Sequence, residues 1–291
     1  MPDGVLVDPG VLRDWPLPAP GSDKEERGRL LLVAGSRDTP GAGRLAAEAA
    51  LRVGAGKVQL VTARSCAPSL AVDAPELMVT GAREDDSGNI EPQEADRILE
   101  WTRGSSAVLL GPGFTDTEAA AELVGRLLPH VESTVVLDAL ATAYVTGGPE
   151  RLAALATPVL LTVNPTELAK CLELDETEVE ADLARHTTTL ARRTRAVVLC
   201  GGPTKFVACG DDLWRVEAGN AGLGTAGSGD VQAGIVTGLL GRGAEPAQAA
   251  VWGAYLHGTA GDRLTESVGP VGYLARELTG ELPGLLARLE A

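Results

Sequence analysis

Residues Gly219–Gly243 read GNAGLGTAGSGDVQAGIVTGLLGRG, a glycine-rich loop that continues without a break into an apolar segment. From Asp230 onward the apolar residues recur at helical spacing, which predicts an amphipathic helix that buries one face. Ahead of the helix, Gly227-Ser228-Gly229 leaves backbone N–H groups free to point at a ligand. Together with the positive end of the helix dipole, these groups predict an anion site suited to phosphate.

Asp230 is the unusual residue of this stretch, because a carboxylate beside a phosphate site costs free energy unless it has a role. The role that fits is to accept the proton of a hydroxyl that attacks the phosphate. The alternative is that Asp230 is only the N-cap of the helix, a position that aspartate suits well. The number of flanking glycines favours phosphate chemistry: Gly219, Gly222, Gly224, Gly227 and Gly229.

Length and composition indicate a globular chain. It has 291 residues, of which 44% are hydrophobic, which is enough for one large α/β domain. The net charge of −15 argues against a nucleic-acid partner, because no basic stripe would offset phosphate repulsion. The sequence has neither an apolar signal-peptide region nor an apolar run of membrane-spanning length, so we expect no membrane association.

The cysteines and histidines do not suggest a metal centre. The four cysteines form no CxxC pair and the three histidines are far apart, so we expect no zinc site and reduced thiols in a cytoplasmic protein. Cys200 has no flanking Lys or His to lower its pKa, so we expect a buried small side chain rather than a reactive thiol. We expect His257, on a predicted helix, to be a core histidine whose ring is hydrogen-bonded.

Short apolar runs alternate with loops and helical segments along the chain, the pattern of a parallel sheet covered on both faces. We therefore predict an α/β fold with a central, mostly parallel sheet in a single domain, residues 1–291, whose residues 1–28 form an irregular N-terminal arm. A helix is expected over Arg44–Val53, and a β-hairpin joined by Gly210-Asp211. The predicted strands are Arg29–Ala34, Lys57–Thr62, Ala107–Leu110, Thr134–Leu137, Val159–Thr162, Ala196–Leu199, Lys205–Cys209 and Asp212–Val216.

Polar residues follow several of these strands and should meet at the carboxyl edge of the sheet. Asp138 either orients a substrate or metal-bound water, or caps the next helix. Asn164 and Glu167 either reach phosphate and hydrated Mg²⁺, or form a capping box at a helix start. The last two readings are compatible, because a capped helix start is also an edge that a ligand can touch.

Two segments match dinucleotide-binding patterns weakly. Gly41–Ala46 fits G-x-G-x-x-A and Gly222–Gly227 fits G-x-G-x-x-G. A seven-residue loop precedes the first, whereas the Rossmann turn is tight, and the second follows a hairpin. No G-x-x-x-x-G-K-[ST] occurs, which excludes a P-loop motif.

Taken in order, several motifs make the chain resemble the ADP/ATP-dependent NAD(P)H-hydrate dehydratases of the ribokinase-like superfamily. The matching pieces are Gly35-Ser36, Gly41-Ala42, Ala50–Gly56, Pro75–Val79, Gly111-Pro112-Gly113, Val136–Leu140, Gly219-Asn220, Gly227–Asp230 and His257–Asp262. The resemblance implies a ribokinase-like fold with the hairpin near the nucleotide site. It implies repair of hydrated NADH and NADPH with ADP or ATP and Mg²⁺: the hydrate hydroxyl is phosphorylated and phosphate is then eliminated.

The resemblance also implies roles for individual residues. Asp230 would be the catalytic base, and Glu167 would reach Mg²⁺ through water. The hydrate would contact Ala42, Gly113, Asp138, Asn164 and Asp230, and the nucleotide would contact Cys200, Gly201, Gly202, Pro203, Thr204, Gly227, Ser228 and Gly229. A homo-oligomer, with an interface on an Ala/Leu-rich surface helix, and a separate NAD(P)H-hydrate epimerase as functional partner are further expectations.

Two positions depart from the family pattern. Asn164 stands where the family usually has the histidine of TPHPGE, and Cys200 stands where it usually has the lysine of KG. Lys205, five residues on, could replace that charge. Asn-x-x-Glu is what sugar and vitamin kinases of the superfamily carry, so an ATP-dependent kinase of a small alcohol is one alternative. A nucleotide-binding module without activity is the other.

Overall fold

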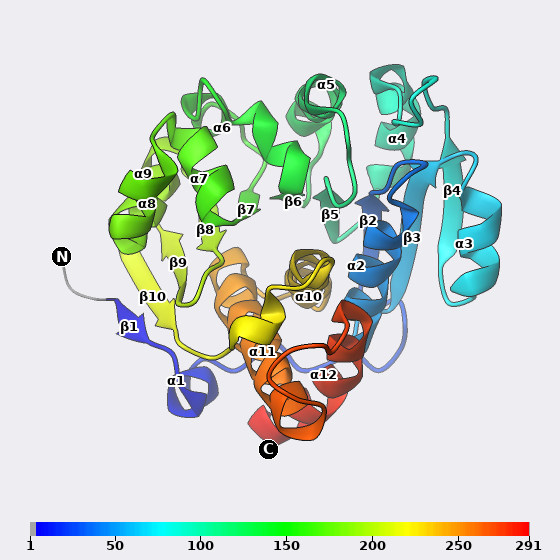
Figure 1. Ribbon diagram of the computed structural model, residues 1–291. Coiled ribbons are helices and arrows are strands. Elements are labelled where there is room, and N and C mark those ends of the chain that lie inside the picture. The colour runs from blue at the N-terminus through cyan, green and yellow to red at the C-terminus, as the bar shows by residue number, and fades with distance from the viewer. Residues whose placement is uncertain (1–3, 291) are drawn as a thin grey trace.

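The fold is built on one ten-stranded sheet with the strand order β1-β10-β9-β8-β7-β6-β5-β2-β3-β4 (Figure 1). The structure is a computed structural model that describes residues 4–290. All paired strands are parallel except β9, which runs against both of its neighbours. The strands are β1 Val5–Leu6, β2 Arg29–Val33, β3 Lys57–Ala63, β4 Met78–Ala82, β5 Ala107–Leu110, β6 Thr134–Asp138, β7 Val159–Val163, β8 Val197–Cys200, β9 Lys205–Cys209 and β10 Asp212–Val216.

Helices cover both faces of the sheet (Figure 1), with α2, α10, α11 and α12 on one side and α4, α5, α7 and α9 on the other. None of the helices within residues 4–290 combines the length and hydropathy of a membrane span. The α-helices are α1 Pro9–Asp14, α2 Pro40–Arg52, α3 Ala67–Asp73, α4 Ala95–Thr102, α5 Thr117–Leu127, α6 Glu150–Ala153, α7 Pro165–Leu172, α8 Glu176–Ala181, α9 Leu183–Thr194, α10 Ser228–Gly241, α11 Pro246–Ser267 and α12 Ala275–Leu289. The 3₁₀ turns are η1 Pro92–Glu94, η2 Leu128–His130, η3 Ala139–Tyr144 and η4 Ala221–Leu223.

The continuous apolar strands feed two separate cores. In β2, Leu30 and Leu32 pack with the helices of one face, whereas Leu31 and Val33 pack with those of the other. This is the two-residue period of a strand that is buried on both faces. Because the helices lie on the faces, the edge formed by the strand ends is free for a site.

The predicted strands and the hairpin are confirmed, with ends that differ by one residue at most. The hairpin is β9–β10, paired from Lys205 opposite Val216 to Cys209 opposite Asp212. Helix α2 begins at Pro40, four residues earlier than expected, because proline suits the first turn of a helix. Strand β4 was not predicted. It is an edge strand that pairs only with β3 among the described strands. Its sequence therefore lacks the continuous apolar run that marks the buried strands.

The prediction of an irregular arm over residues 1–28 is wrong for two short elements, β1 and α1, and residues 15–28 form no regular helix or strand. Strand β1 pairs with β10, and Asp8 caps α1 by accepting a hydrogen bond from the Val11 amide at 2.9 Å. Trp15 stacks on the Trp214 ring with centroids 5.6 Å apart. These tertiary contacts order a segment whose proline and charge content suggested no structure. Residues 1–3 lie outside the described residues.

Helix α10 also differs from the expectation, because it is buried on every side rather than on one face. From Val231 to Gly241 each residue is buried between the sheet, α2, α11 and α12. The helix begins at Ser228, two residues before Asp230. A helix that is apolar all round is typical of a central position, and this one directs its N-terminus at the strand ends.

Candidate functional site

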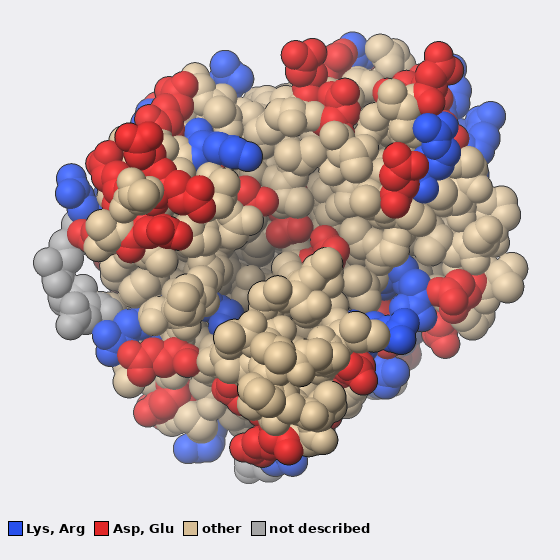
Figure 2. Space-filling view, in the orientation of Figure 1, with Lys and Arg blue, Asp and Glu red and all other residues tan. Residues whose placement is uncertain are grey.

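A cavity of about 790 Å³ lies where the N-terminus of α10 meets the carboxyl ends of β6 and β7. In Figure 2 this hollow is the centre of the face shown, and acidic side chains gather inside it. Most of its lining comes from the ends of β6 and β7, the start of α7, the turn after β8, and the loop that leads into α10, and Lys205 of β9 and His257 of α11 complete it. The predicted meeting of strand-end residues at one edge is therefore confirmed for this group.

Three carboxylates, those of Asp138, Glu167 and Asp230, line the cavity. Burial raises the pKa of Asp138 well above its ordinary value, and the charges of Glu167 and Asp230 raise it further. Burial likewise raises the pKa of Glu167. Burial raises the pKa of Asp230 to about 6. Such a value leaves Asp230 ionised at neutral pH but basic enough to take up a proton.

Asp230 is not an N-cap, so that alternative is wrong. The N-cap of α10 is Gly227, and Asp230 is the third helical residue with its side chain facing the cavity. Asp138 does not cap η3 with its side chain either. Its Oδ1 instead accepts a hydrogen bond from Thr162 Oγ1 at 2.6 Å. Thr162 was not singled out in the sequence, although its place at a strand end could have identified it.

The glycine-rich loop forms the predicted cradle at the start of α10. Gly227 has a φ of 88°, and a Cβ there would lie 2.6 Å from Leu45 Cδ1, so only glycine fits. Ser228 Oγ lies 2.9 Å from His257 Nε2, and Gln232 Nε2 lies 3.4 Å from His257 Nδ1. His257 is thus buried and hydrogen-bonded, as predicted, and it also lines the cavity. The first amides of α10 face the cavity with no helical acceptor of their own.

One wall of the cavity is formed by the segment Ala218–Gly224, most of which lines the space, and side chains from α11 and the loop after it hold this segment in place. Asp262 accepts hydrogen bonds from the Gly219 amide and from Asn220 Nδ2, both at 3.0 Å. The Tyr273 hydroxyl donates to Asn220 Oδ1 at 3.1 Å. The late motif on α11 that contains His257 and Asp262 therefore helps to hold this wall of the cavity in place.

Asn164 and Glu167 form the complete capping box of α7. Asn164 Oδ1 accepts from the Glu167 amide at 2.8 Å, and Glu167 Oε2 accepts from the Asn164 amide at 2.9 Å. Both residues also line the cavity, so the helix start is a ligand edge as well. The two interpretations of this motif coexist.

Replacing Asn164 by alanine is expected to lower the free energy of unfolding by about 1 kcal/mol, because the cap of α7 is lost. Urea unfolding measures this effect. Asp8→Ala removes the cap of α1 far from the cavity and is the matched control. If Asn164 also contacts substrate, only its variant raises KM for the substrate. Equal KM values in the two variants would contradict that contact.

The predicted nucleotide residues fall into two groups. Gly201, Gly202 and Pro203 line the cavity, as do the three residues Gly227–Gly229. Cys200 and Thr204 do not line it. Cys200 is fully buried, and burial raises the pKa of its thiol to about 12, so it is the inert small side chain that was expected.

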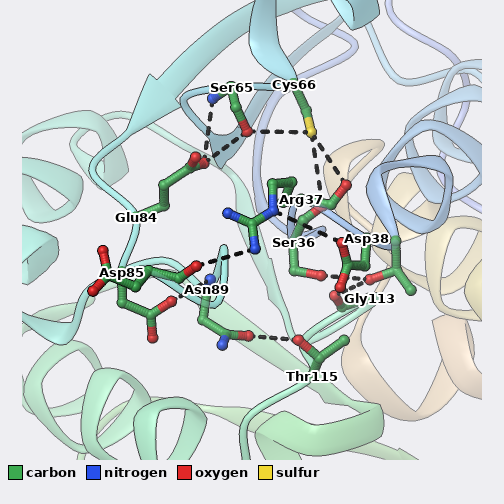
Figure 3. Close-up of polar contacts among 12 residues, drawn as sticks. Ser36, Arg37, Asp38, Ser65, Cys66, Glu84, Asp85, Asn89, Gly113 and Thr115 are labelled. Carbon is green, nitrogen blue, oxygen red and sulfur yellow. Dashed lines mark hydrogen bonds and ion pairs between the residues drawn. The ribbon is translucent and has the colours of Figure 1, made fainter.

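Ala42 and Gly113 lie close to each other but outside the lining of the main cavity. A Cβ on Gly113 would come 2.8 Å from Ala42 Cβ, and the Gly113 carbonyl accepts from Thr39 Oγ1 at 2.6 Å. Figure 3 shows Gly113 beside a polar cluster at the carboxyl ends of β2–β5. In that cluster Glu84 accepts from the Ser65 hydroxyl at 3.0 Å. Leu45, one turn after Ala42, touches Gly227, so α2 joins this region to the cradle.

The donor set of the cavity fits Mg²⁺ bound through water. No cluster of three His, Cys, Asp or Glu side chains within residues 4–290 is arranged to hold a metal directly. The three carboxylates nevertheless offer the oxygen ligands that Mg²⁺ prefers, and this ion normally keeps several waters beside a phosphate. Glu167 therefore suits an outer position, in contact with metal-bound water.

Residues 30–284 match the model of a protein family described as NAD(P)H-hydrate dehydratase. The ADP-dependent (S)-NAD(P)H-hydrate dehydratase of Xanthomonas campestris is 44% identical over 97% of this chain and 96% of its own. A bifunctional NAD(P)H-hydrate repair enzyme of Moorella thermoacetica is 36% identical over 90% of this chain. The match covers 50% of that enzyme, so the chain spans about half its length.

A solved structure from Bacillus subtilis has the same architecture. It is the ADP/ATP-dependent NAD(P)H-hydrate dehydratase co-crystallised with ATP and Mg²⁺, 27% identical to this chain. The superposition covers all of both chains with a TM-score of 0.85. A ribokinase-like protein from Enterococcus faecalis, 22% identical with a TM-score of 0.82, has the same fold. The ribokinase-like fold is thereby confirmed.

Proposed function

Because the chain belongs to the NAD(P)H-hydrate dehydratase family, we propose that it is an ADP-dependent (S)-NAD(P)H-hydrate dehydratase. The observation that carries this proposal is a single cavity in which Asp230, with a pKa of about 6, lies beside a glycine cradle at a helix N-terminus. The vitamin-kinase alternative rested on Asn164 and Glu167, which the capping box of α7 accounts for.

The chemistry explains why a dehydratase needs a phosphate site. Hydroxide is a poor leaving group, so the hydroxyl of the hydrated ring first attacks the terminal phosphorus of ADP and AMP leaves. The ring nitrogen lone pair then expels the new phosphate ester as inorganic phosphate. A proton leaves the neighbouring ring carbon, and the dihydropyridine double bond is restored. NADH or NADPH, AMP and phosphate are the products.

The geometry of the cavity supports a role for each of its residues. Asp230 accepts the hydroxyl proton during the attack, and the amides of Gly227–Gly229 hold the transferring phosphoryl group. The turn Gly201–Pro203 borders the rest of the nucleotide. Bound Mg²⁺ supplies charge neutralisation of the phosphates, with Glu167 and Asp138 as its candidate outer ligands.

The two polar regions support a placement for the hydrate. The nicotinamide end lies at Asp230, next to Asp138 and Asn164, which line the same cavity. The remainder of the dinucleotide extends along the start of α2 toward Ala42 and Gly113. Their contacts are made by backbone groups, because an alanine and a glycine offer no polar side chain.

The test is a direct assay of repair. Purified protein is mixed with hydrated NADH, Mg²⁺ and either ADP or ATP, and the absorbance of the restored dihydropyridine ring is followed. We expect turnover with ADP and stoichiometric release of AMP. Binding of ADP without any ring absorbance would instead support the inactive binding module, and turnover of a small alcohol to its phosphate would support the kinase.

We also propose that the protein works in the cytoplasm, as a homo-oligomer, beside a separate epimerase. The four cysteines are all free, which suits a reducing compartment. Val268, Val271 and Leu274 are exposed apolar residues in the segment between α11 and α12, which suits an interface. The bifunctional relatives are about twice as long as the matched region, which suits a partner that supplies a second activity.

A further inference from the structure

Lys205 occupies an unusual position in the cavity. It begins β9, is 4% exposed, and lines the same space as the cradle. Among the described residues that line the cavity it is the only lysine or arginine. Its Nζ donates a hydrogen bond to the Ala218 carbonyl at 2.8 Å. The side chain thus ends at the wall formed by Ala218–Gly224, and Gly219 leaves room for it, since a Cβ there would lie 2.8 Å from Nζ.

The charge of Lys205 has no counter-ion at contact distance. Within residues 4–290 no carboxylate lies within 4 Å of its Nζ. Asp262 attracts the charge, but its two oxygens already accept hydrogen bonds from Gly219 and Asn220. A buried ammonium group with one carbonyl partner is costly unless an anion joins it. This arrangement therefore indicates an anionic ligand.

The cradle lies on the same side as this charge. A Cβ on Gly219 would lie 2.8 Å from Lys205 Nζ and 3.4 Å from the Cα of Gly258, the residue after His257, so the two groups are close. The positive charge of Lys205 accordingly helps to lower the pKa of His257 to about 3, after the larger effect of burial. His257 in turn is hydrogen-bonded to Ser228, the first residue of α10. Because His257 stays neutral, Lys205 is the one full positive charge among the described residues that line the cavity together with the amides of Gly227–Gly229.

We propose that Lys205 binds the phosphate oxygens of the nucleotide and supplies the positive charge of the phosphate site. The proposal deepens the proposed function and rests on it. The helix N-terminus and the glycine amides orient the phosphate and offer partial positive charges. Lys205 adds a full positive charge, which attracts the anionic nucleotide and offsets the acidic side chains of the cavity. It is a positioning residue for the nucleotide, distinct from the proton transfer at Asp230.

Calorimetric titration of adenosine, AMP, ADP and ATP tests this role, with Lys205→Gln against Lys24→Gln. The control removes the same charge from an exposed residue at the opposite end of β2 and β3. We expect Lys205→Gln to weaken ADP binding by about 10- to 100-fold, the value of a hydrogen bond to a charged group. Adenosine binding should change less than about twofold, because it has no phosphate.

The outcomes separate this inference from the proposed function. If the wild type binds ADP no more tightly than adenosine, the phosphate site itself fails. If the wild type prefers ADP but Lys205→Gln weakens ADP and adenosine equally, Lys205 only supports the wall. Unchanged ADP binding in the variant would also overturn the inference.

A measurement on the wild type covers the case in which the variant does not fold. The chain has four lysines, Lys24, Lys57, Lys170 and Lys205, so ¹³C-lysine labelling gives a simple side-chain spectrum. Burial lowers the pKa of Lys205 to about 8, although the charge of Asp262 opposes this shift. The neighbouring His257 is neutral at this pH. The lysine signal that titrates near pH 8 is therefore that of Lys205. We expect ADP, but not adenosine, to shift this signal and raise its pKa. An ADP-saturated protein with an unmoved signal would contradict the contact.

Discussion

Replacing Asp230 by asparagine is expected to lower kcat by about 100- to 10,000-fold, the usual value of a general base. Asparagine keeps the size of the side chain but cannot accept the hydroxyl proton. The KM for ADP should stay the same or fall, because a negative charge beside the phosphates has been removed. Steady-state assays with hydrated NADH and ADP measure both constants.

The fold of this variant should be intact. Burial raises the pKa of Asp230, so the ionised carboxylate is less favourable in the folded protein than in water, and neutral asparagine should be at least as stable at pH 7. Glu180→Gln, an exposed carboxyl on α8, is the matched control and should keep full activity. An Asp230→Asn enzyme within about tenfold of the wild type would remove Asp230 as the base.

The same pKa predicts the acid limb of the pH profile. Asp230 must be ionised to accept a proton, so kcat/KM should be at its plateau above a pH of about 6 and fall as the pH drops below that value. The profile of residual activity in Asp230→Asn should lack this limb. A wild-type limb near the ordinary aspartate value of 3.8 would show that burial does not tune this group.

The parts of the fold that could be predicted are those that local sequence determines. Strand β5 was predicted from Ala107 to Leu110 without error, because a buried parallel strand is a continuous apolar run between turn residues. The edge strands could not be found this way. β1 has two residues, Val5 and Leu6, and it exists because β10 lies beside it. Tertiary pairing with β10, and not the local sequence, therefore makes these two residues a strand.

The candidate site likewise has parts that local sequence determines and parts that only tertiary contacts determine. The cradle and its carboxylate could be read from one stretch, because Gly227 and Asp230 are close in sequence and their chemistry depends on a helix start. Lys205 could only be considered as a replacement charge, since its relevance depends on the hairpin β9–β10 placing it at the wall near Gly219. The contact of Thr162 with Asp138 joins two strands, so the sequence offers only the place of each residue at a strand end and not their pairing.

Helix α10 was expected to bury one face because only its large residues were counted. Its glycines are the missing information. A Cβ on Gly234 would lie 2.2 Å from the Ala46 carbonyl oxygen, and one on Gly238 would lie 2.7 Å from that of Ala50. The two glycines are four residues apart and so share the face that packs on α2. They allow the two backbones to approach, which is how α10 is buried all round.

Gly234→Ala is therefore expected to destabilise the protein by about 3 kcal/mol, the upper end of the cost of overpacking. The reason is that the Cβ meets backbone atoms of α2, at 2.2–2.8 Å, and backbone cannot turn aside as a side chain can. Alanine's better helix propensity offsets only about 1 kcal/mol. Denaturant unfolding of the two proteins measures the difference.

Gly280→Ala is the control that isolates this contact. Gly280 lies inside α12, and a Cβ there meets nothing within 4 Å, so the change should stabilise the protein by about 0.5–1 kcal/mol. A Gly234→Ala protein as stable as Gly280→Ala would mean that α2 and α10 can move apart without cost. If separating the two helices does cost free energy, the substitution displaces α10 and Asp230 with it. We therefore expect Gly234→Ala to lose kcat even below its unfolding temperature.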